Sequence, residues 1–95
     1  MKYLVRVELH NASYADYETL HKAMAVKGFQ RTIRAGDGVL YYLPTAEYTA
    51  ETGQSGNQVY AAADSAAAST GKSRGVLVVQ YDGAWWGGLG KVKAA

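Results

Sequence analysis

The spacing of apolar residues changes once within the first 29 residues, and this change limits the folds open to the chain. From Tyr3 to Leu9 every second residue is apolar, which is typical of a strand with one buried face. From Ser13 to Phe29 the apolar residues recur every three or four positions, as in an amphipathic helix. A strand followed by a helix is therefore predicted, and the strand residues expected in the core are Tyr3, Val5, Val7 and Leu9.

Both ends of the predicted helix carry recognisable signals. Ser13 can cap the first turn, and Asp16 three residues later completes a capping-box pattern. Gly28 can take a left-handed conformation after the last turn, with Phe29 returning to contact Met24, as in a Schellman ending. The face that this helix is expected to bury consists of Tyr17, Leu20 and Met24.

The middle of the chain has the pattern of a hairpin. Residues 30–34 and 39–43 are predicted strands, and the glycines and aspartate of 35–38 suit a tight turn between them. Pro44 cannot donate a hydrogen bond to a sheet, so it indicates a bulge or the end of a strand. Pairing is expected to resume beyond it, over residues 45–48.

A second helix and a last strand follow. Ser55 and Gln58 form another capping-box pattern, and an alanine-rich helix is predicted from there to Thr70. Gly71 is expected to end this helix, and residues 74–81 alternate as a strand does.

This order of elements predicts an α+β fold of the ferredoxin-like βαββαβ type. We expect one domain over residues 1–95, with a four-stranded antiparallel sheet in the order 4-1-3-2 and both helices on one face. The other face would stay open and carry Arg6, Glu8 and His10. Residues 87–95 are expected to form a partly flexible tail, while Trp85 and Trp86 dock on the protein.

Composition excludes several classes of protein. The chain has 48% hydrophobic residues, no cysteine and a net charge of +2. Disulfides and thiolate-bound zinc are therefore excluded. The positive charge also falls short of the dense basic patch expected of a strong nucleic-acid binder. Apolar runs are only a few residues long and the N-terminal segment lacks the pattern of a signal peptide, so we expect a cytoplasmic protein without membrane contact.

No motif identifies a catalytic centre. Gly71-Lys72-Ser73 resembles the end of a phosphate-binding loop, but it follows a helix where that loop must precede one. His10 and His21 lack the further ligands of a metal site. We therefore predict no metal site and no cofactor, and no catalytic residue can be assigned.

Aromatic and basic residues on the open sheet form the candidate binding site. Rings on which unstacked bases lie, beside cations that meet phosphates, are a workable platform for single-stranded RNA. The candidate RNA-binding residues are Arg6, His10, Arg31, Arg34, Tyr41 and Tyr42.

Several segments resemble a known family. They are residues 5–12, 16–21, 28–33, 42–48 and 70–73, and they are similar to the GhoS-like family of short bacterial and phage proteins, relatives of a type V antitoxin endoribonuclease. The resemblance spans roughly residues 3–86. It implies a ferredoxin-like fold and an RNA-directed role, such as cleavage of a toxin transcript, but it transfers no catalytic residue to this chain.

Two functions follow as expectations. The first is a small RNA-directed protein, either a metal-independent endoribonuclease similar to GhoS or a single-strand binder acting as an antitoxin. The second is a non-enzymatic phage or plasmid accessory protein, which acts as a dimeric protein-interaction module. A homodimer is expected in either case, because a small sheet with one uncovered face tends to bury that face in a partner.

Overall fold

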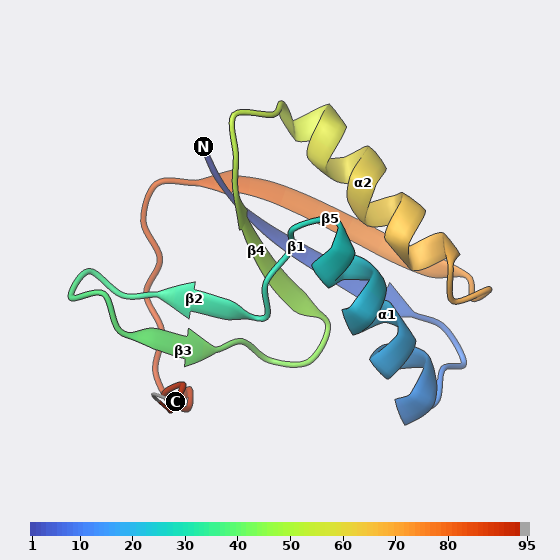
Figure 1. Cartoon of the computed structure of the whole chain (residues 1–95), viewed down its shortest axis with the longest axis horizontal. Coiled ribbons are helices and arrows are strands. Elements are labelled where there is room, and N and C mark those ends of the chain that lie inside the picture. The colour runs from blue at the N-terminus through green and yellow to red at the C-terminus, as the bar shows by residue number, and fades with distance from the viewer. Residues whose placement is uncertain (94–95) are drawn as a thin grey trace.

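Residues 1–93, the part of the chain that the computed structural model describes, form five strands and two helices (Figure 1). In chain order these are β1 (Lys2–Leu9), α1 (Tyr14–Val26), β2 (Thr32–Arg34), β3 (Leu40–Tyr42), β4 (Glu47–Glu51), α2 (Gly56–Ala68) and β5 (Arg74–Tyr81). Within this described part, none of the helices is long and apolar enough to cross a membrane.

The main sheet has three antiparallel strands in the order β4-β1-β5. Val5 in the central strand lies opposite Tyr48 of β4 and Val78 of β5. The predicted central position of the first strand is therefore confirmed, with a partner on each side. The predicted last strand is also confirmed, because β5 spans residues 74–81.

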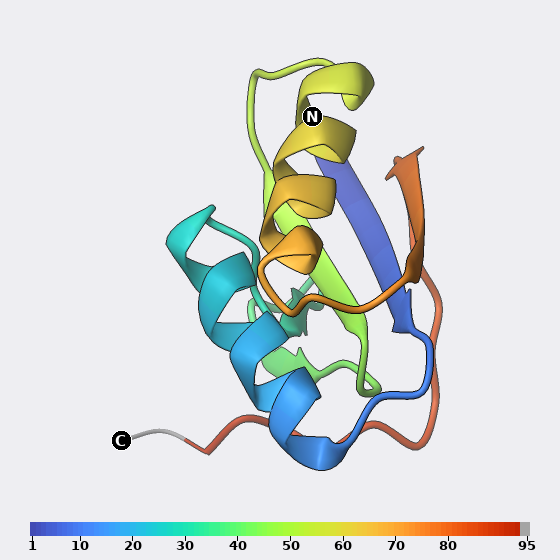
Figure 2. The ribbon, with the colours of Figure 1, turned by 90° about the vertical axis from the view of Figure 1, so that its right-hand side faces the viewer.

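The core lies between this sheet and the two helices, which cover the same face of it (Figure 2). The alternation read from the sequence is confirmed: Tyr3, Val5 and Val7 are at most 1% exposed. Leu20 and Met24 of α1 are fully buried against them. The other buried members of the core are Leu9, Phe29, Tyr48, Val59, Ala63, Ala66 and Ala67. Tyr17, which was expected to be buried, is only partly buried and lies against this cluster.

The helix ends follow the predicted signals. The Ser13 hydroxyl accepts from the Asp16 N–H while the Asp16 carboxylate accepts from the Ser13 N–H, which is the reciprocal capping box. Gly28 has φ of +91°, and the Phe29 N–H donates to the Met24 carbonyl at 3.0 Å, as a Schellman ending requires. Ser55 caps α2 in the predicted way, although α2 ends at Ala68 rather than at Thr70.

The expectation of one four-stranded sheet is wrong. The predicted hairpin forms a separate two-stranded sheet, β2-β3, which meets the main sheet at a single bridge between Gln30 and Thr49. Pro44 has no N–H for a ladder, and Ala46 turns the chain with φ of +77°. The segment after the proline therefore leaves β3 and starts a new strand, β4, beside β1.

The C-terminal segment adds a third strand-like segment to the hairpin. The Tyr42 N–H donates to Gly90 at 2.8 Å and the Val92 N–H donates to Leu40 at 2.9 Å, on either side of a bridge between Tyr41 and Lys91. This segment thus covers the edge of β3 in its own chain. The flexibility predicted for residues 87–95 stays a prediction, and residues 94–95 lie outside the described part.

The two tryptophans behave differently. Trp86 is partly buried, and its ring meets the Tyr41 ring edge-on at 5.5 Å between centroids. Trp85 is 91% exposed, so the prediction that both tryptophans dock is wrong for Trp85. The difference arises because only Trp86 faces the hairpin, where Tyr41 and Ile33 provide apolar surface.

Candidate nucleic-acid interface

The structure gathers four of the six candidate RNA-binding residues and separates the other two. Arg34, Tyr41 and Tyr42 lie on β2 and β3, and the carbonyl of Arg31 accepts from Leu43 at 2.8 Å across the base of the same hairpin. Arg6 and His10 lie at the far end of the main sheet: Arg6 is in the second half of β1 and His10 follows its last residue. Arg6 and His10 therefore do not belong to the same site as the other four candidates.

We use "hairpin–tail surface" for the hairpin, residues 30–43, together with the segment that covers its edge, residues 84–93. It holds four basic residues and one acidic residue, Asp37, for a net charge of +3. The four basic residues are Arg31, Arg34, Lys91 and Lys93. Pairing of residues 90–92 with β3 brings the segment that carries the two lysines to the hairpin that carries the two arginines.

Aromatic rings accompany these cations. Tyr42 is 52% exposed and Trp85 is 91% exposed, so both offer ring surface to solvent. Tyr41 and Trp86 hold each other edge-on and fix the docked segment in place. Exposed rings next to cations are the combination that accepts unstacked bases with their phosphates.

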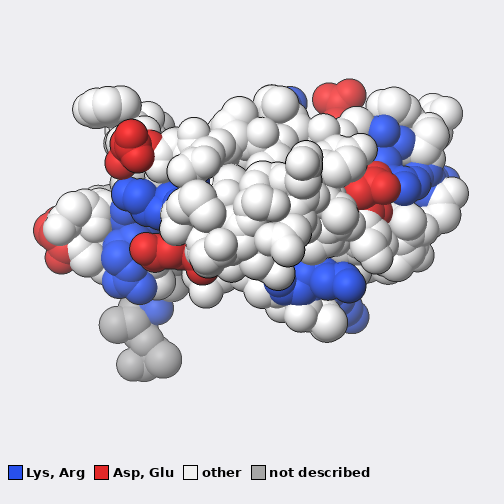
Figure 3. Space-filling model, turned by 90° about the horizontal axis from the view of Figure 1, so that it is seen from above, with Lys and Arg blue, Asp and Glu red and all other residues white. Residues whose placement is uncertain are grey.

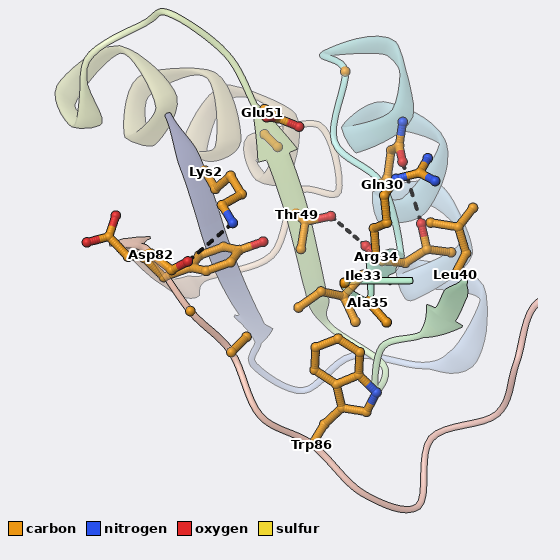
Figure 4. A pocket seen from close by; sticks show the side chains of 17 residues that line it. Lys2, Gln30, Ile33, Arg34, Ala35, Leu40, Thr49, Glu51, Asp82 and Trp86 are labelled. Carbon is orange, nitrogen blue, oxygen red and sulfur yellow. Dashed lines mark hydrogen bonds between the residues drawn. The ribbon is translucent and has the colours of Figure 1, made fainter. Parts of the chain in front are cut away.

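A cleft of about 630 Å³ opens beside this surface, between the hairpin, the end of β4 and the segment after β5 (Figure 4). Its walls include the rings of Tyr81 and Trp86, and the cations Lys2 and Arg34. The Lys2 ammonium lies 5.4 Å from the centre of the Tyr81 ring and donates to the backbone carbonyl of Asp82 at 3.3 Å. The volume is within the usual range for a small ligand or a single base.

Acidic side chains also line the cleft. Glu51 and Asp82 stand on the same wall as Lys2 (Figure 4). The negative charge of these acidic residues would repel a phosphate inside the cleft but not a neutral base. The cleft therefore suits a base, and the cations of the hairpin–tail surface suit the backbone that carries it.

Arg6 and His10 belong to a different cluster. Glu8 lies between them, with its carboxylate oxygens 3.9 Å from the Arg6 guanidinium and 4.0 Å from His10 Nε2. His10 Nδ1 is 3.1 Å from the hydroxyl of Ser73. Ser73, His10 and Glu8 thus lie in the order nucleophile, base and acid of a catalytic triad. However, the 4.0 Å from His10 to Glu8 exceeds hydrogen-bond reach, and all the groups are largely solvated. In this cluster Glu8 is the acidic partner of Arg6, so the Arg6 guanidinium is not free to bind a phosphate.

The other histidine is structural. His21 Nδ1 lies 2.6 Å from the hydroxyl of Tyr48, and the two rings are in contact. Burial lowers the pKa of His21, and the positive charge of Arg31 lowers it further. Burial also raises the pKa of Tyr48 well above its usual range. The neutral imidazole can therefore accept the hydrogen bond that the Tyr48 hydroxyl donates.

The His21–Tyr48 pair should make the free energy of unfolding depend on pH. Because the folded state holds the pKa of His21 below its ordinary value of 6.5, the unfolded chain binds the proton more tightly. The contribution of His21 to the free energy of unfolding should be constant above pH 6.5, fall as the pH drops below it, and level off below the lowered pKa. Urea titrations between pH 8 and pH 5 would show this fall, and it should be smaller in His21→Gln. An equal fall in both proteins would contradict the assignment.

The basic side chains seen from above form separate groups and no continuous patch (Figure 3). Strong binding of duplex nucleic acid to this face is therefore not favoured. Among residues 1–93 no group of three or more histidines, aspartates or glutamates could hold a metal ion.

Sequence reasoning missed four members of the site. They are Trp85, Trp86, Lys91 and Lys93. The two tryptophans were expected to dock on the protein and residues 87–95 to form a tail, but nothing in the local pattern showed that this segment returns to the hairpin. A turn-rich, glycine-containing segment following the last strand is the one signal for such a return.

Comparison of the chain with protein-family models, with curated proteins and with solved structures found no match. The resemblance to the GhoS-like family therefore stays a prediction based on the short segments given above.

Proposed function

We propose that this protein binds single-stranded RNA through the hairpin–tail surface. The observation that carries the proposal is the pairing of residues 90–92 with β3. This pairing brings together two segments about 50 residues apart in sequence, which have a combined net charge of +3 and four aromatic rings. Neither segment has this composition alone.

The chemistry of the surface favours single strands over duplexes. Rings such as Trp85 and Tyr42 can stack only on bases that are not already stacked and paired. Arg31, Lys91 and Lys93 can follow the phosphates, while the cleft beside Arg34 takes one base between Tyr81 and Trp86. Binding should be weak and sensitive to salt, because a few cations neutralise a few phosphates.

We propose that the protein binds RNA and does not cleave it. Cleavage through the ribose hydroxyl needs a general base beside the phosphate. His21 is engaged with Tyr48, and His10 lies at the other end of β1 from the cleft. An RNA binder of this kind is compatible with an antitoxin role, which acts in the cytoplasm on a transcript.

We further propose that the fold is a variant of the ferredoxin-like arrangement. The order β4-β1-β5 supports this, together with the bridge from Gln30 to Thr49 at the position where a fourth strand would lie. In this variant the segment after Gln30 leaves the main sheet and forms the β2-β3 hairpin, which carries part of the proposed binding surface.

The double variant Arg31→Ala/Arg34→Ala should weaken binding of a labelled single-stranded RNA by about 3–10-fold, measured by fluorescence anisotropy at low salt. Both side chains are exposed and outside the core, so the domain should stay folded. The slope of log affinity against log salt should also become shallower by up to about 1.4, because each neutralised phosphate of a single strand contributes about 0.7.

The matched control is Lys22→Ala/Lys27→Ala, which removes two exposed cations from the region of α1. This control changes the net charge equally but leaves the hairpin–tail surface intact. Equal loss of affinity in the two double variants would contradict the proposal, because it would mean that only net charge matters.

A further inference from the structure

Strand β5 is a long sheet edge that nothing in the described part of the chain covers. It has eight residues, and it ends the sheet on the side away from β4 (Figure 2). Two of the other edges are met by other segments: β4 meets Gln30, and β3 meets residues 90–92. Proteins usually blunt a bare edge with proline or lysine, and the stretch from Gly75 to Tyr81 has neither.

The hydrogen-bonding groups on this edge can be identified. His10 donates to Ser73 at 2.9 Å on the β5 side of β1, whereas Val7 donates to Ala46 at 2.9 Å on the β4 side. Antiparallel pairing alternates along a strand, so the odd residues of β5 bond to β1. The N–H and C=O groups that point outward from the edge therefore belong to Arg74, Val76, Val78 and Gln80.

Apolar side chains flank the edge on both faces of the sheet. On the open face, Leu77 is 59% exposed and Val79 is 39% exposed. On the helix face, a cleft of about 460 Å³ runs between α2 and β5, with Tyr60 and Val78 in its walls. Tyr60 is itself 47% exposed. A partner that pairs with β5 would cover all of these groups together.

We propose that the partner is a second copy of this chain, paired antiparallel through β5 about a two-fold axis at Val78. The axis puts outward-pointing groups of one strand opposite those of the other, as a continuous sheet requires. In this register Leu77 lies opposite Val79 of the second copy, so the exposed apolar side chains meet. The result is a six-stranded sheet with the hairpin–tail surfaces at its two ends.

Charge and shape select this register. It places Arg74, which already bonds the Asp64 carboxylate at 3.0 Å in its own chain, opposite Asp82 of the second copy, so opposite charges lie at each end of the paired strands. It also places the large residue Tyr81 opposite Gly75 of the second copy, which has no side chain to compete for space. A two-fold axis at Leu77 would bring Arg74 opposite Gln80 and lose both matches.

Because the chain has no cysteine, the register can be tested by disulfide formation. Residues 77 and 79 of the two copies would form a non-hydrogen-bonded pair, whose Cα atoms lie about 4.5 Å apart, within disulfide range. The full chain carrying Leu77→Cys is mixed with the full chain carrying Val79→Cys and oxidised at tens of micromolar. Non-reducing electrophoresis should show a crosslinked dimer in the mixture, several-fold more abundant than in either variant alone.

Two further measurements accompany the crosslinking. Sedimentation of the wild-type chain should give twice the mass of one chain, and Val79→Lys should shift it to the monomer. Val26→Lys is the matched control, since Val26 is 85% exposed on α1 and should leave the dimer intact. Circular dichroism checks that each variant folds. Crosslinking of Leu77→Cys with itself as fast as in the mixture, or a wild-type monomer at this concentration, would overturn the proposal.

Discussion

Leu20→Ala is expected to lower the free energy of unfolding by about 2–5 kcal/mol, the usual range for a buried leucine. Leu20 is fully buried in the core that the two helices form with the main sheet. The substitution removes apolar atoms from the core and leaves a cavity that neighbouring strands cannot fill without bending. Urea unfolding followed by circular dichroism measures the loss.

Val26→Ala is the matched control for this prediction. It removes apolar atoms from the same helix, but Val26 is 85% exposed and lies at the helix end. Its effect should stay within about 0.5 kcal/mol, as for most surface substitutions. Comparable losses in the two variants would mean that α1 does not bury the predicted face.

The regular elements could be predicted because their signals are local. A strand that alternates from Tyr3 to Leu9 and a helix capped by Ser13 and Asp16 depend on residues a few positions apart. The Schellman ending at Gly28 depends on the turn that precedes it. None of these requires knowledge of a distant segment.

The sheet arrangement could not be predicted in full, because it depends on where a strand goes after a break. Pro44 indicated an interruption, but both a bulge and a new strand were compatible with it. The positive φ of Ala46 directs the chain to β1, and an alanine gives no warning of such a conformation. A continuous fourth strand was the simpler expectation, and it was wrong.

The candidate site was predicted in part for the same reason. Arg31, Arg34 and the two hairpin tyrosines are neighbours in sequence as well as in space. Lys91 joins them only through a bridge to Tyr41, 50 positions earlier. Arg6 was included because it faces outward, although Glu8 two residues along the same strand face was a visible partner.

Removal of the segment after Gly83 should reduce the affinity for single-stranded RNA by at least about tenfold. The truncated protein would lose both tryptophans and the two lysines of the hairpin–tail surface. A base stacked on an aromatic side chain contributes about 1–3 kcal/mol, so one lost stack already gives about a tenfold change. The main sheet and helices should stay folded, because the core contains no residue from this segment.

Circular dichroism and cooperative urea unfolding of the truncated protein are the controls for this experiment. Trp85→Ala provides a smaller change, since Trp85 is exposed and its removal leaves the pairing with β3 in place. We expect its loss of affinity to lie between those of the wild-type and truncated proteins. Unchanged affinity after truncation would show that the hairpin–tail surface is not the site.

A direct titration tests whether the protein binds single-stranded RNA. Fluorescence anisotropy of a labelled RNA is followed as wild-type protein is added at low and at moderate salt, with a duplex of the same sequence beside it. We predict saturable binding of the single strand at low salt, weaker binding of the duplex, and a loss of affinity as salt rises. The proposed function would be contradicted if single strands of varied sequence did not bind at low salt, or if the duplex bound more tightly.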